Sequence, residues 1–299
     1  MPWQDIKLND GREIPGISFG SSRHSGDTVS TVDEAIHAGF DSIDTAQIYR
    51  SEAAVGQAIK QSGLSRDEIW ITTKWSGLKT AKESIQDSLQ ALGVDYVDLY
   101  LIHFPAVTKG DIPGSWKHLE EFKKLGHAKS IGVSNFEISH LKELLSHAHI
   151  KPSVNQIPFH PDILAKQEAL VQYLKEHNIA IEGYSPLAPL WNDDKKSPVL
   201  KVVKDIAEKR NVPEERVLLA WSRSKGVIPV TASSTKSRIE SFIAAGDLNL
   251  TEEEVEAIDK AGYKSARNAE IRRKVVNGIK WVTAAGLLTY LAVSRLTQI

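Results

Sequence analysis

The chain of 299 residues contains no cysteine. This absence excludes disulfide bonds, metal sites built from thiolates and cysteine nucleophiles together, and no metal is predicted. It is typical of a protein from a reducing compartment. The first sixteen residues also lack the apolar core of a signal peptide, so we expect a cytoplasmic protein.

No excess of charge of either sign is present. Lys and Arg total 37 and Asp and Glu total 38, which gives a formal net charge of -1. Such a protein has no global field that attracts nucleic acid or an anionic membrane surface. We therefore expect a small neutral or mildly polar substrate and no nucleic-acid partner.

No stretch rich in proline, glycine or serine divides the chain before about residue 260. Short β-type runs alternate there with amphipathic helical stretches, a pattern typical of βα units and a parallel sheet. After an N-terminal turn at residues 9–11, the pattern predicts eight strands. They are expected at residues 16–19, 42–45, 69–73, 97–102, 129–133, 153–156, 180–184 and 227–230.

The stretches between these strands carry helical periodicity, and several end at a glycine, as helices often do. Two of them precede the last strand, so one is an insertion. Eight βα units in about 260 residues predict one α/β domain, a closed (β/α)8 TIM barrel with a short N-terminal hairpin. The competing open doubly wound sheet would carry G-x-G-x-x-G after its first strand, and this sequence lacks it. Among these helical stretches are residues 29–38, 53–61, 81–92, 114–125, 139–147, 199–210 and 214–225.

The end of the chain differs from the rest, so we divide the sequence into a barrel (1–262) and a tail (263–299). The tail carries an extra apolar helix, expected at residues 278–296, in which residues 281–294 are uncharged. Fourteen residues span about 21 Å, less than a hydrocarbon core of about 30 Å. We therefore expect this helix to pack on the barrel or on a partner. Membrane contact is the alternative, with Lys280 and Arg295 reaching the interface.

Three ionisable residues stand where predicted strands end. Asp44, Lys74 and His103 are spaced 30 and 29 residues apart, about one βα unit each. Barrel enzymes place their chemistry at the C-terminal ends of the strands, so these side chains should converge. Tyr49 follows Asp44 by five residues, in the loop over the same mouth.

Any one of these residues alone is more often a helix cap or a solvated rim residue. Their combination predicts a site for general acid catalysis. A lysine ammonium beside a phenol lowers the pKa of the tyrosine, so Tyr49 is the candidate proton donor to a carbonyl oxygen. Asp44 would hold Lys74 charged, and His103 would orient the carbonyl. No protein nucleophile is evident at this mouth, which suggests that a cofactor supplies hydride.

Six motifs, in family order, resemble those of the aldo-keto reductase family, with fungal carbonyl-reducing members nearest, and the resemblance covers residues 5 to about 262. The first is FDSIDTAQIY at 40–49, followed by Glu52 and Gly56. The resemblance implies a catalytic tetrad of Asp44, Tyr49, Lys74 and His103. It also implies NADPH-dependent reduction of aldehydes or ketones, such as α-keto esters and diketones, to alcohols. The other motifs are TTK at 72–74, LYLIH at 99–103, SIGVSNF at 130–136, NQ at 155–156 and GYSPL at 183–187.

The same resemblance implies positions that bind the cofactor. Ser134, Asn135 and Gln156 would hold the nicotinamide carboxamide, and Tyr184 would stack on the ring. Further along the chain, Ser185 and Leu187 would lie along the pyrophosphate.

The phosphate end departs from the family pattern, because Val230 stands where many relatives have a lysine. Basic groups come later, at Lys236 and Arg238, behind Ser233 and Ser234. Hydroxyls, helix N-terminal amides and a guanidinium suit the 2′-phosphate of NADPH. The other interpretation is a helix N-cap with a solvated first turn.

The substrate pocket is predicted to include Ile48, Trp75, Phe104 and Trp191. A core anchor is the other interpretation of Trp191. Two other functions stay open. One is an NADPH-binding regulatory subunit with the same barrel and little turnover. The other is a hydrolytic or lyase barrel that uses Asp44 and His103, and it leaves the match at Ser134, Asn135 and Gln156 unexplained.

Overall fold

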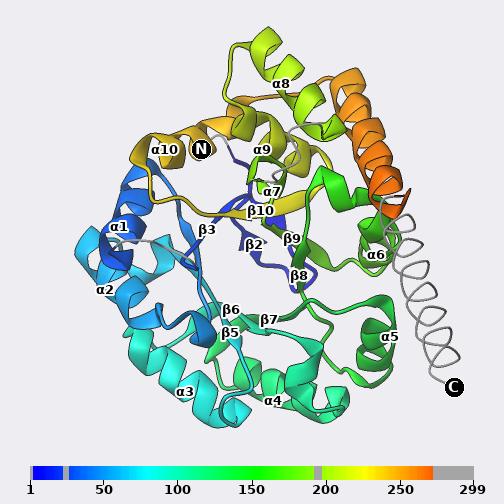
Figure 1. Ribbon diagram of the computed structural model, residues 1–299. Helices are drawn as coiled ribbons and strands as arrows, with labels where there is room; N and C mark the ends of the chain where they lie inside the picture. Colours follow the sequence, from blue (N-terminus) through cyan, green and yellow to red (C-terminus); the bar gives the residue numbers. More distant parts are fainter. Residues whose placement is uncertain (1–2, 23–26, 192–196, 272–299) are drawn as a thin grey trace, which may run out of the picture.

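The computed structural model describes residues 3–22, 27–191 and 197–271. Within these ranges the centre of the molecule is a closed barrel of parallel strands, with β10 returning to pair with β3 (Figure 1). Each of the eight predicted strands overlaps an observed one, so the barrel is confirmed and the open sheet is excluded. The strands are β3 (Ser18–Gly20), β4 (Ser42–Asp44), β5 (Trp70–Trp75), β6 (Val97–Ile102), β7 (Ala128–Ser134), β8 (Val154–Pro158), β9 (Ala180–Tyr184) and β10 (Val227–Thr231).

Helices surround the barrel on its outside (Figure 1). Both α8 and α9 precede β10, which confirms the predicted insertion. The α-helices are α1 (Thr28–Ala38), α2 (Glu52–Ser62), α3 (Ala81–Leu92), α4 (Ile112–Lys124), α5 (Ile138–His147), α6 (Leu164–Glu176), α7 (Ala188–Trp191), α8 (Pro198–Arg210), α9 (Glu214–Ser224) and α10 (Lys236–Ala244). Short 3-10 segments are η1 (Gln47–Tyr49), η2 (Arg66–Glu68), η3 (Pro105–Thr108), η4 (Pro161–Ile163) and η5 (Ala245–Asp247).

The predicted barrel implies a helix between the sixth and seventh strands, where α6 lies, but none of the helical stretches named above falls there. Its buried face is Leu164, Gln167, Leu170 and Leu174. Gln167 interrupts the apolar stripe because its Nε2 donates to the carbonyl oxygen of Pro158, 3.0 Å away. The helix is thus held by a tertiary hydrogen bond that periodicity alone does not show.

Strand alternation decides which side chains enter the barrel. Along β5, Trp70 packs with the apolar residues inside the barrel, whereas Ile71 and Trp75 pack with the helices outside. Successive side chains of a strand point to opposite faces. Lys74 lies four positions after Trp70 on the same strand and therefore points inward as well.

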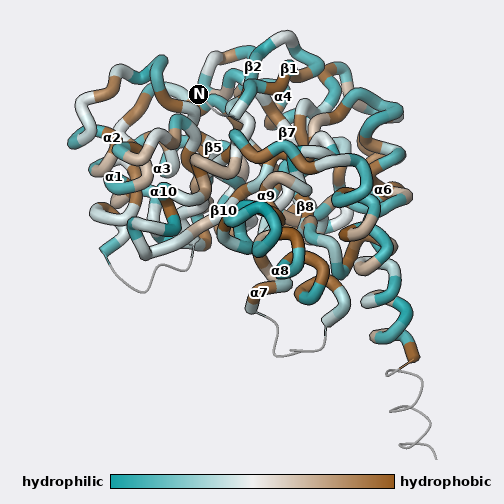
Figure 2. Tube along the Cα trace, turned by 90° about the horizontal axis from the view of Figure 1, so that it is seen from above, coloured by the Kyte–Doolittle hydropathy of each residue, from teal (hydrophilic) through white to brown (hydrophobic). Residues whose placement is uncertain are grey.

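The N-terminal hairpin closes one end of the barrel. Strands β1 (Ile6–Lys7) and β2 (Glu13–Ile14) pair antiparallel, with Ile6 opposite Ile14. Ile14 is fully buried and packs in the cluster inside the barrel, together with Leu99 and Ile228. Figure 2 shows the hairpin at one end and α7 at the other. The strands' C-terminal ends thus form the open mouth.

Residues 252–271 form one helix that crosses the predicted domain boundary without a break. A side chain at Gly262 would place Cβ 2.4 Å from the carbonyl oxygen of Pro161, so glycine permits this close packing on η4. Ser265 also donates to Asp162, 2.7 Å away. The predicted apolar helix at 278–296 lies outside the described residues. None of the helices in the described part of the chain has the length and apolar run that a bilayer crossing needs.

Candidate active site

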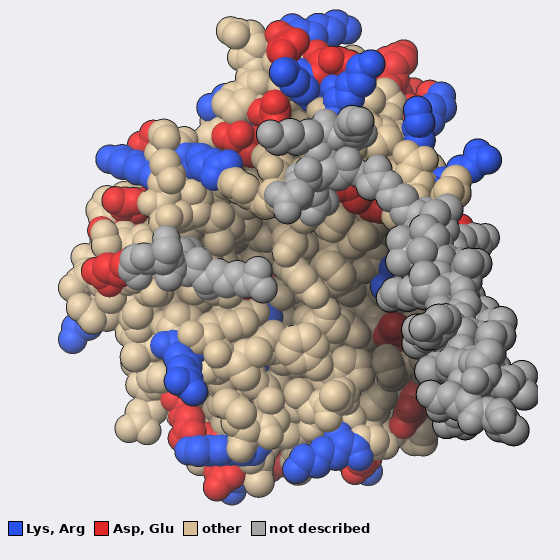
Figure 3. Space-filling view, viewed as in Figure 1, with Lys and Arg blue, Asp and Glu red and all other residues tan. Residues whose placement is uncertain are grey.

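The barrel mouth contains a cavity of about 940 Å³. On the face in Figure 3, charged side chains gather around the outer helices, and the centre of the mouth carries few of them. The cavity extends from the loop after β4 to the first turn of α10. It is lined by fifteen of the predicted site residues: Asp44, Ile48, Tyr49, His103, Phe104, Ser134, Asn135, Gln156, Tyr184, Ser185, Leu187, Trp191, Ser233, Ser234 and Arg238.

The four predicted catalytic side chains meet at one end of this cavity. Lys74 Nζ donates to Asp44 Oδ1 at 2.6 Å and to the carbonyl oxygen of Thr45 at 2.9 Å. The same Nζ lies 5.1 Å from the centre of the Tyr49 ring. The Tyr49 hydroxyl lies 3.3 Å from His103 Nε2. The structure therefore brings together a buried ion pair and a phenol that faces the cavity.

Local hydrogen bonds hold the loop that carries Tyr49. The backbone N–H of Tyr49 donates to the carbonyl oxygen of Ala46 at 2.9 Å, closing η1. Beneath it, the Ser51 hydroxyl lies 3.0 Å from Thr45 Oγ1 and 2.8 Å from Ser21 Oγ. These buried hydroxyls tie the loop to β4 and to the end of β3, which fixes the base of the turn that carries the phenol.

Lys74 is fully buried, yet it stays charged. Burial lowers the pKa of its ammonium, but attraction to Asp44 and Tyr49, together with the hydrogen bond that Lys74 donates to Asp44, outweighs burial and raises that pKa above its ordinary value. The attraction between Lys74 and Tyr49 acts on both partners, so it also favours the ionised phenol.

His103 is neutral at physiological pH. Burial and the nearby Lys74 charge lower the pKa of its imidazole to about 3. Ser76 Oγ lies 3.2 Å from His103 Nδ1. A hydroxyl that donates to Nδ1 leaves the ring proton on Nε2, which faces the Tyr49 hydroxyl.

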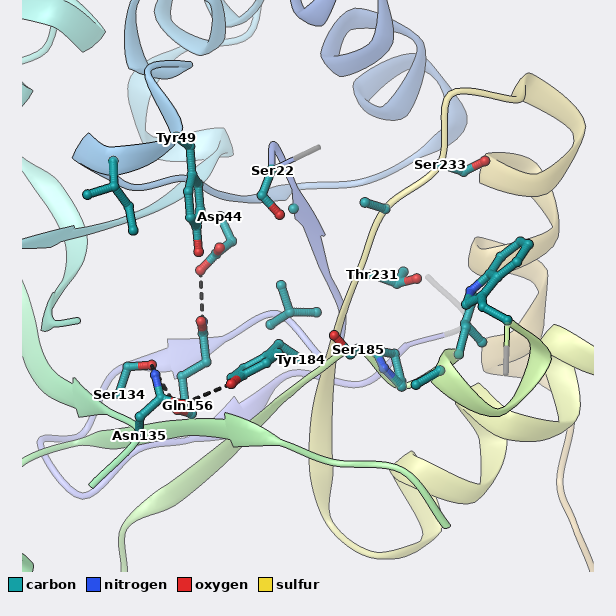
Figure 4. A pocket seen from close by; sticks show the side chains of 18 of the residues that line it. Ser22, Asp44, Tyr49, Ser134, Asn135, Gln156, Tyr184, Ser185, Thr231 and Ser233 are labelled. Atoms are coloured by element: carbon teal, nitrogen blue, oxygen red, sulfur yellow. Dashed lines mark hydrogen bonds between the residues drawn. The ribbon is translucent and has the colours of Figure 1, made fainter. Parts of the chain in front are cut away.

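A second group of side chains forms the wall beside the tetrad (Figure 4). Asn135 has a left-handed backbone with φ 62°, which asparagine tolerates, and its Nδ2 donates to the carbonyl oxygen of His103 at 3.0 Å. The Tyr184 hydroxyl donates to Asn135 Oδ1 at 2.9 Å. Ser134 donates to the carbonyl oxygen of Gln156, also at 2.9 Å. The predicted amide-binding residues therefore form one connected wall.

Glu182 belongs to this network and is absent from the sequence predictions. Gln156 Nε2 donates to Asp44 Oδ2 at 2.8 Å and to Glu182 Oε2 at 2.9 Å. Burial and the nearby Asp44 raise the pKa of Glu182 to about 7. The available signal was an acidic residue inside a predicted buried strand, directly after Ile181.

The far end of the cavity contains the predicted phosphate residues, with one exception. Ser233, Ser234 and Arg238 line it, whereas Lys236 does not and is exposed at the first position of α10. The Arg238 guanidinium lies 4.3 Å from the centre of the Trp191 ring. The other lining residues, most of them small, were not predicted: Gly20, Ser22, Pro186, Ala188, Val230, Thr231, Ala232 and Thr235.

Trp75 is the predicted pocket residue that the structure places elsewhere. Its side chain packs against the helices outside the barrel, and its indole N–H donates to the carbonyl oxygen of Lys79 at 3.0 Å. The reason is strand alternation, because the residue after an inward lysine points outward. Ile48 and Phe104 are partly exposed at the mouth, and Phe104 stacks on His103 at 4.3 Å.

Comparisons with known proteins establish the family. The pattern of the Aldo/keto reductase family matches residues 18–262. Glyoxal reductase of Bacillus subtilis is 38% identical over 260 residues, which cover 85% of this chain and 91% of that protein. NADPH-dependent alpha-keto amide reductase of Saccharomyces cerevisiae is 35% identical over 285 residues, which cover 87% and 91%.

A solved structure agrees with these sequence relatives. The Bombyx mori aldo-keto reductase in complex with NADP has a TM-score of 0.79 and 34% identity, covering 86% of this chain and 92% of that one. The chain therefore belongs to the aldo/keto reductase family. Bacterial and yeast relatives have similar identities, so the comparisons assign the family and not the expected fungal subgroup.

Proposed function

We propose that this protein catalyses the NADPH-dependent reduction of small aldehydes or ketones to alcohols, with Tyr49 as the general acid. The observation that carries the proposal is the buried Lys74–Asp44 pair beneath Tyr49 and His103, at the end of a cavity whose wall is Asn135 and Gln156. The names of the relatives support α-dicarbonyl and α-keto compounds as the substrate class.

The cavity fits a dinucleotide by the chemistry of its lining. Its tetrad end offers amide and hydroxyl groups suited to a carboxamide, with the half-buried ring of Tyr184 beside them. Its far end offers Ser233, Ser234 and Arg238, hydroxyls and a cation suited to a phosphate. These residues would hold NADPH, which would supply the hydride for the carbonyl carbon.

The chain's own residues manage the proton. A carbonyl oxygen placed at the Tyr49 hydroxyl can accept from that hydroxyl and from neutral His103. As negative charge develops on this oxygen, Tyr49 releases its proton to it. Lys74, held charged by Asp44, then stabilises the phenolate that remains.

The test is NADPH consumption by the purified protein with a panel of aldehydes, α-keto esters, diketones and aldoses. We expect turnover with several members, and faster turnover with α-dicarbonyl compounds. Binding of NADPH without turnover of any member would instead favour the regulatory-subunit alternative. Turnover without a nucleotide would favour the hydrolytic one.

We expect Arg238→Ala to weaken NADPH binding by about tenfold or more and to leave NADH binding nearly unchanged. A charge-assisted hydrogen bond contributes roughly 1.5–3 kcal/mol, and only NADPH carries the 2′-phosphate. Titration calorimetry with both nucleotides measures this. Because Lys236 lies outside the cavity, Lys236→Ala should have a much smaller effect. Equal losses for both nucleotides in Arg238→Ala would show that the arginine does not bind the phosphate.

Truncation after Lys264 should preserve reductase activity. It removes the hydrogen bond from Ser265 to Asp162, worth about 1 kcal/mol, but no residue of the described cavity. Kinetics and thermal unfolding of the shortened chain test this. Loss of turnover in a folded truncated protein would mean that the tail contributes to the substrate pocket.

A further inference from the structure

The side-chain amide of Gln156 lies between two carboxyl groups. Its Nε2 is 2.8 Å from Asp44 Oδ2 and 2.9 Å from Glu182 Oε2. A primary amide has two N–H donors, so these contacts use both of them. Gln156 also lines the cavity, and its oxygen is therefore the amide atom left for a ligand.

Glu182 accepts one of the two Gln156 N–H groups, although burial of its carboxyl group is unfavourable for folding. It faces Gln156 across the β8–β9 pairing and is fully buried. Its other oxygen, Oε1, has no hydrogen-bond partner among the described residues. Burying an acid with an unpaired oxygen disfavours folding, and an apolar residue would fill the same space at lower cost. Packing therefore does not explain the glutamate.

The amide orientation does explain it. If the Gln156 amide were flipped, its oxygen would lie against two acceptors, and both carboxyl groups would lose a donor. Glu182 can accept from Gln156 through Oε2 whether or not its other oxygen is protonated. The two acids together therefore select one of the two amide orientations.

We propose that Glu182 is a positioning residue that, with Asp44, fixes the Gln156 amide so that Oε1 faces the cavity as an acceptor for a nicotinamide carboxamide N–H. This inference rests on the proposed function, since it presumes that NADPH binds here. Glu182 itself does not line the cavity and would contact neither the cofactor nor the substrate. Its effect passes through Gln156.

The experiment compares the binding of NADP+ with that of its 3-acetylpyridine analogue, in which a methyl ketone replaces the carboxamide and removes the N–H donor. The full-length protein should bind NADP+ roughly three- to tenfold more tightly than the analogue, as expected for one hydrogen bond. In Glu182→Leu this ratio should fall roughly twofold or more, because Asp44 alone then holds the Gln156 amide. Glu182→Gln should keep most of it, because its amide oxygen can accept from Gln156.

Gln156→Leu supplies the matched control, and it should bring the ratio to about one, because it removes the amide acceptor itself. The double variant Gln156→Leu/Glu182→Leu should lose nothing further, since both changes remove one interaction. Thermal unfolding separates positioning from a structural role, because Glu182→Leu should be no less stable than the unchanged protein. Glu182→Met replaces the leucine variant if that variant does not fold.

A full ratio in Glu182→Leu or Glu182→Met would overturn the proposal, as would loss of the ratio in Glu182→Gln. A starting ratio of one in a protein that still reduces carbonyls would overturn it while leaving the proposed function intact. Absence of any nucleotide binding would overturn both.

Discussion

Tyr49→Phe should reduce carbonyl reduction by about 10² to 10⁴-fold while NADPH binding stays near its original strength. The substitution removes one oxygen, the atom that lies 3.3 Å from His103 Nε2 and faces the cavity. The aromatic ring, with Lys74 Nζ 5.1 Å from its centre, stays in place. The proton donor is therefore lost without removal of the side chain that fills this part of the mouth.

Steady-state kinetics and NADPH titration on the same preparation measure the two effects. Ile48→Val is a suitable control, since it alters the neighbouring, partly exposed side chain and removes no polar atom. It should change the KM for the carbonyl more than kcat. If Tyr49→Phe kept most of its activity, another group would have to be the proton donor, and the assignment of the tetrad would be wrong.

Lys74→Met should be comparably severe, for an electrostatic reason. Without the ammonium, the Tyr49 phenolate loses its nearby positive charge, which disfavours the ionised form of the tyrosine. In the direction of alcohol oxidation, where the phenolate acts as base, the pH at which activity rises should move upward. The pH profile of alcohol oxidation measures this shift, which a purely structural defect would not produce.

The same substitution also affects stability. It leaves the Asp44 carboxylate buried with Gln156 as its remaining side-chain donor, a change that typically costs about 3–5 kcal/mol. The double variant Lys74→Met/Asp44→Asn removes the uncompensated charge and should recover much of the thermal stability. It should not recover activity. Recovery of activity in the double variant would show that Lys74 serves folding and not the chemistry of Tyr49.

The sequence alone was sufficient for the architecture and for the four candidate residues that meet at the barrel mouth. Strand length, alternation with helices and the missing glycine motif predicted the barrel, because these features are local and repeat along the chain. Equal spacing then placed Asp44, Lys74 and His103 at equivalent strand ends, and parallel strands that end at one mouth must bring them together.

The tertiary structure decided what depends on direction and on neighbours distant in sequence. Trp75 follows Lys74 directly, yet strand alternation points the two side chains to opposite faces. Lys236 and Arg238 are both basic and two residues apart, but the turn of α10 brings Arg238 alone of the two to the cavity.

Glu182 shows most clearly what the sequence pattern alone does not reveal. Its hydrogen-bond partner Gln156 lies 26 positions earlier in the chain, on the neighbouring strand. Asp44, which accepts from the same amide, lies 138 positions before Glu182, on a strand that only barrel closure brings near. The sequence pattern marks an acid in an apolar strand and does not say what it contacts. The hydrogen bond between Glu182 and Gln156 depends on side chains that point into the narrow interior of the barrel. A buried carboxyl group needs a hydrogen-bond donor there, and the structure shows that the Gln156 amide is that donor.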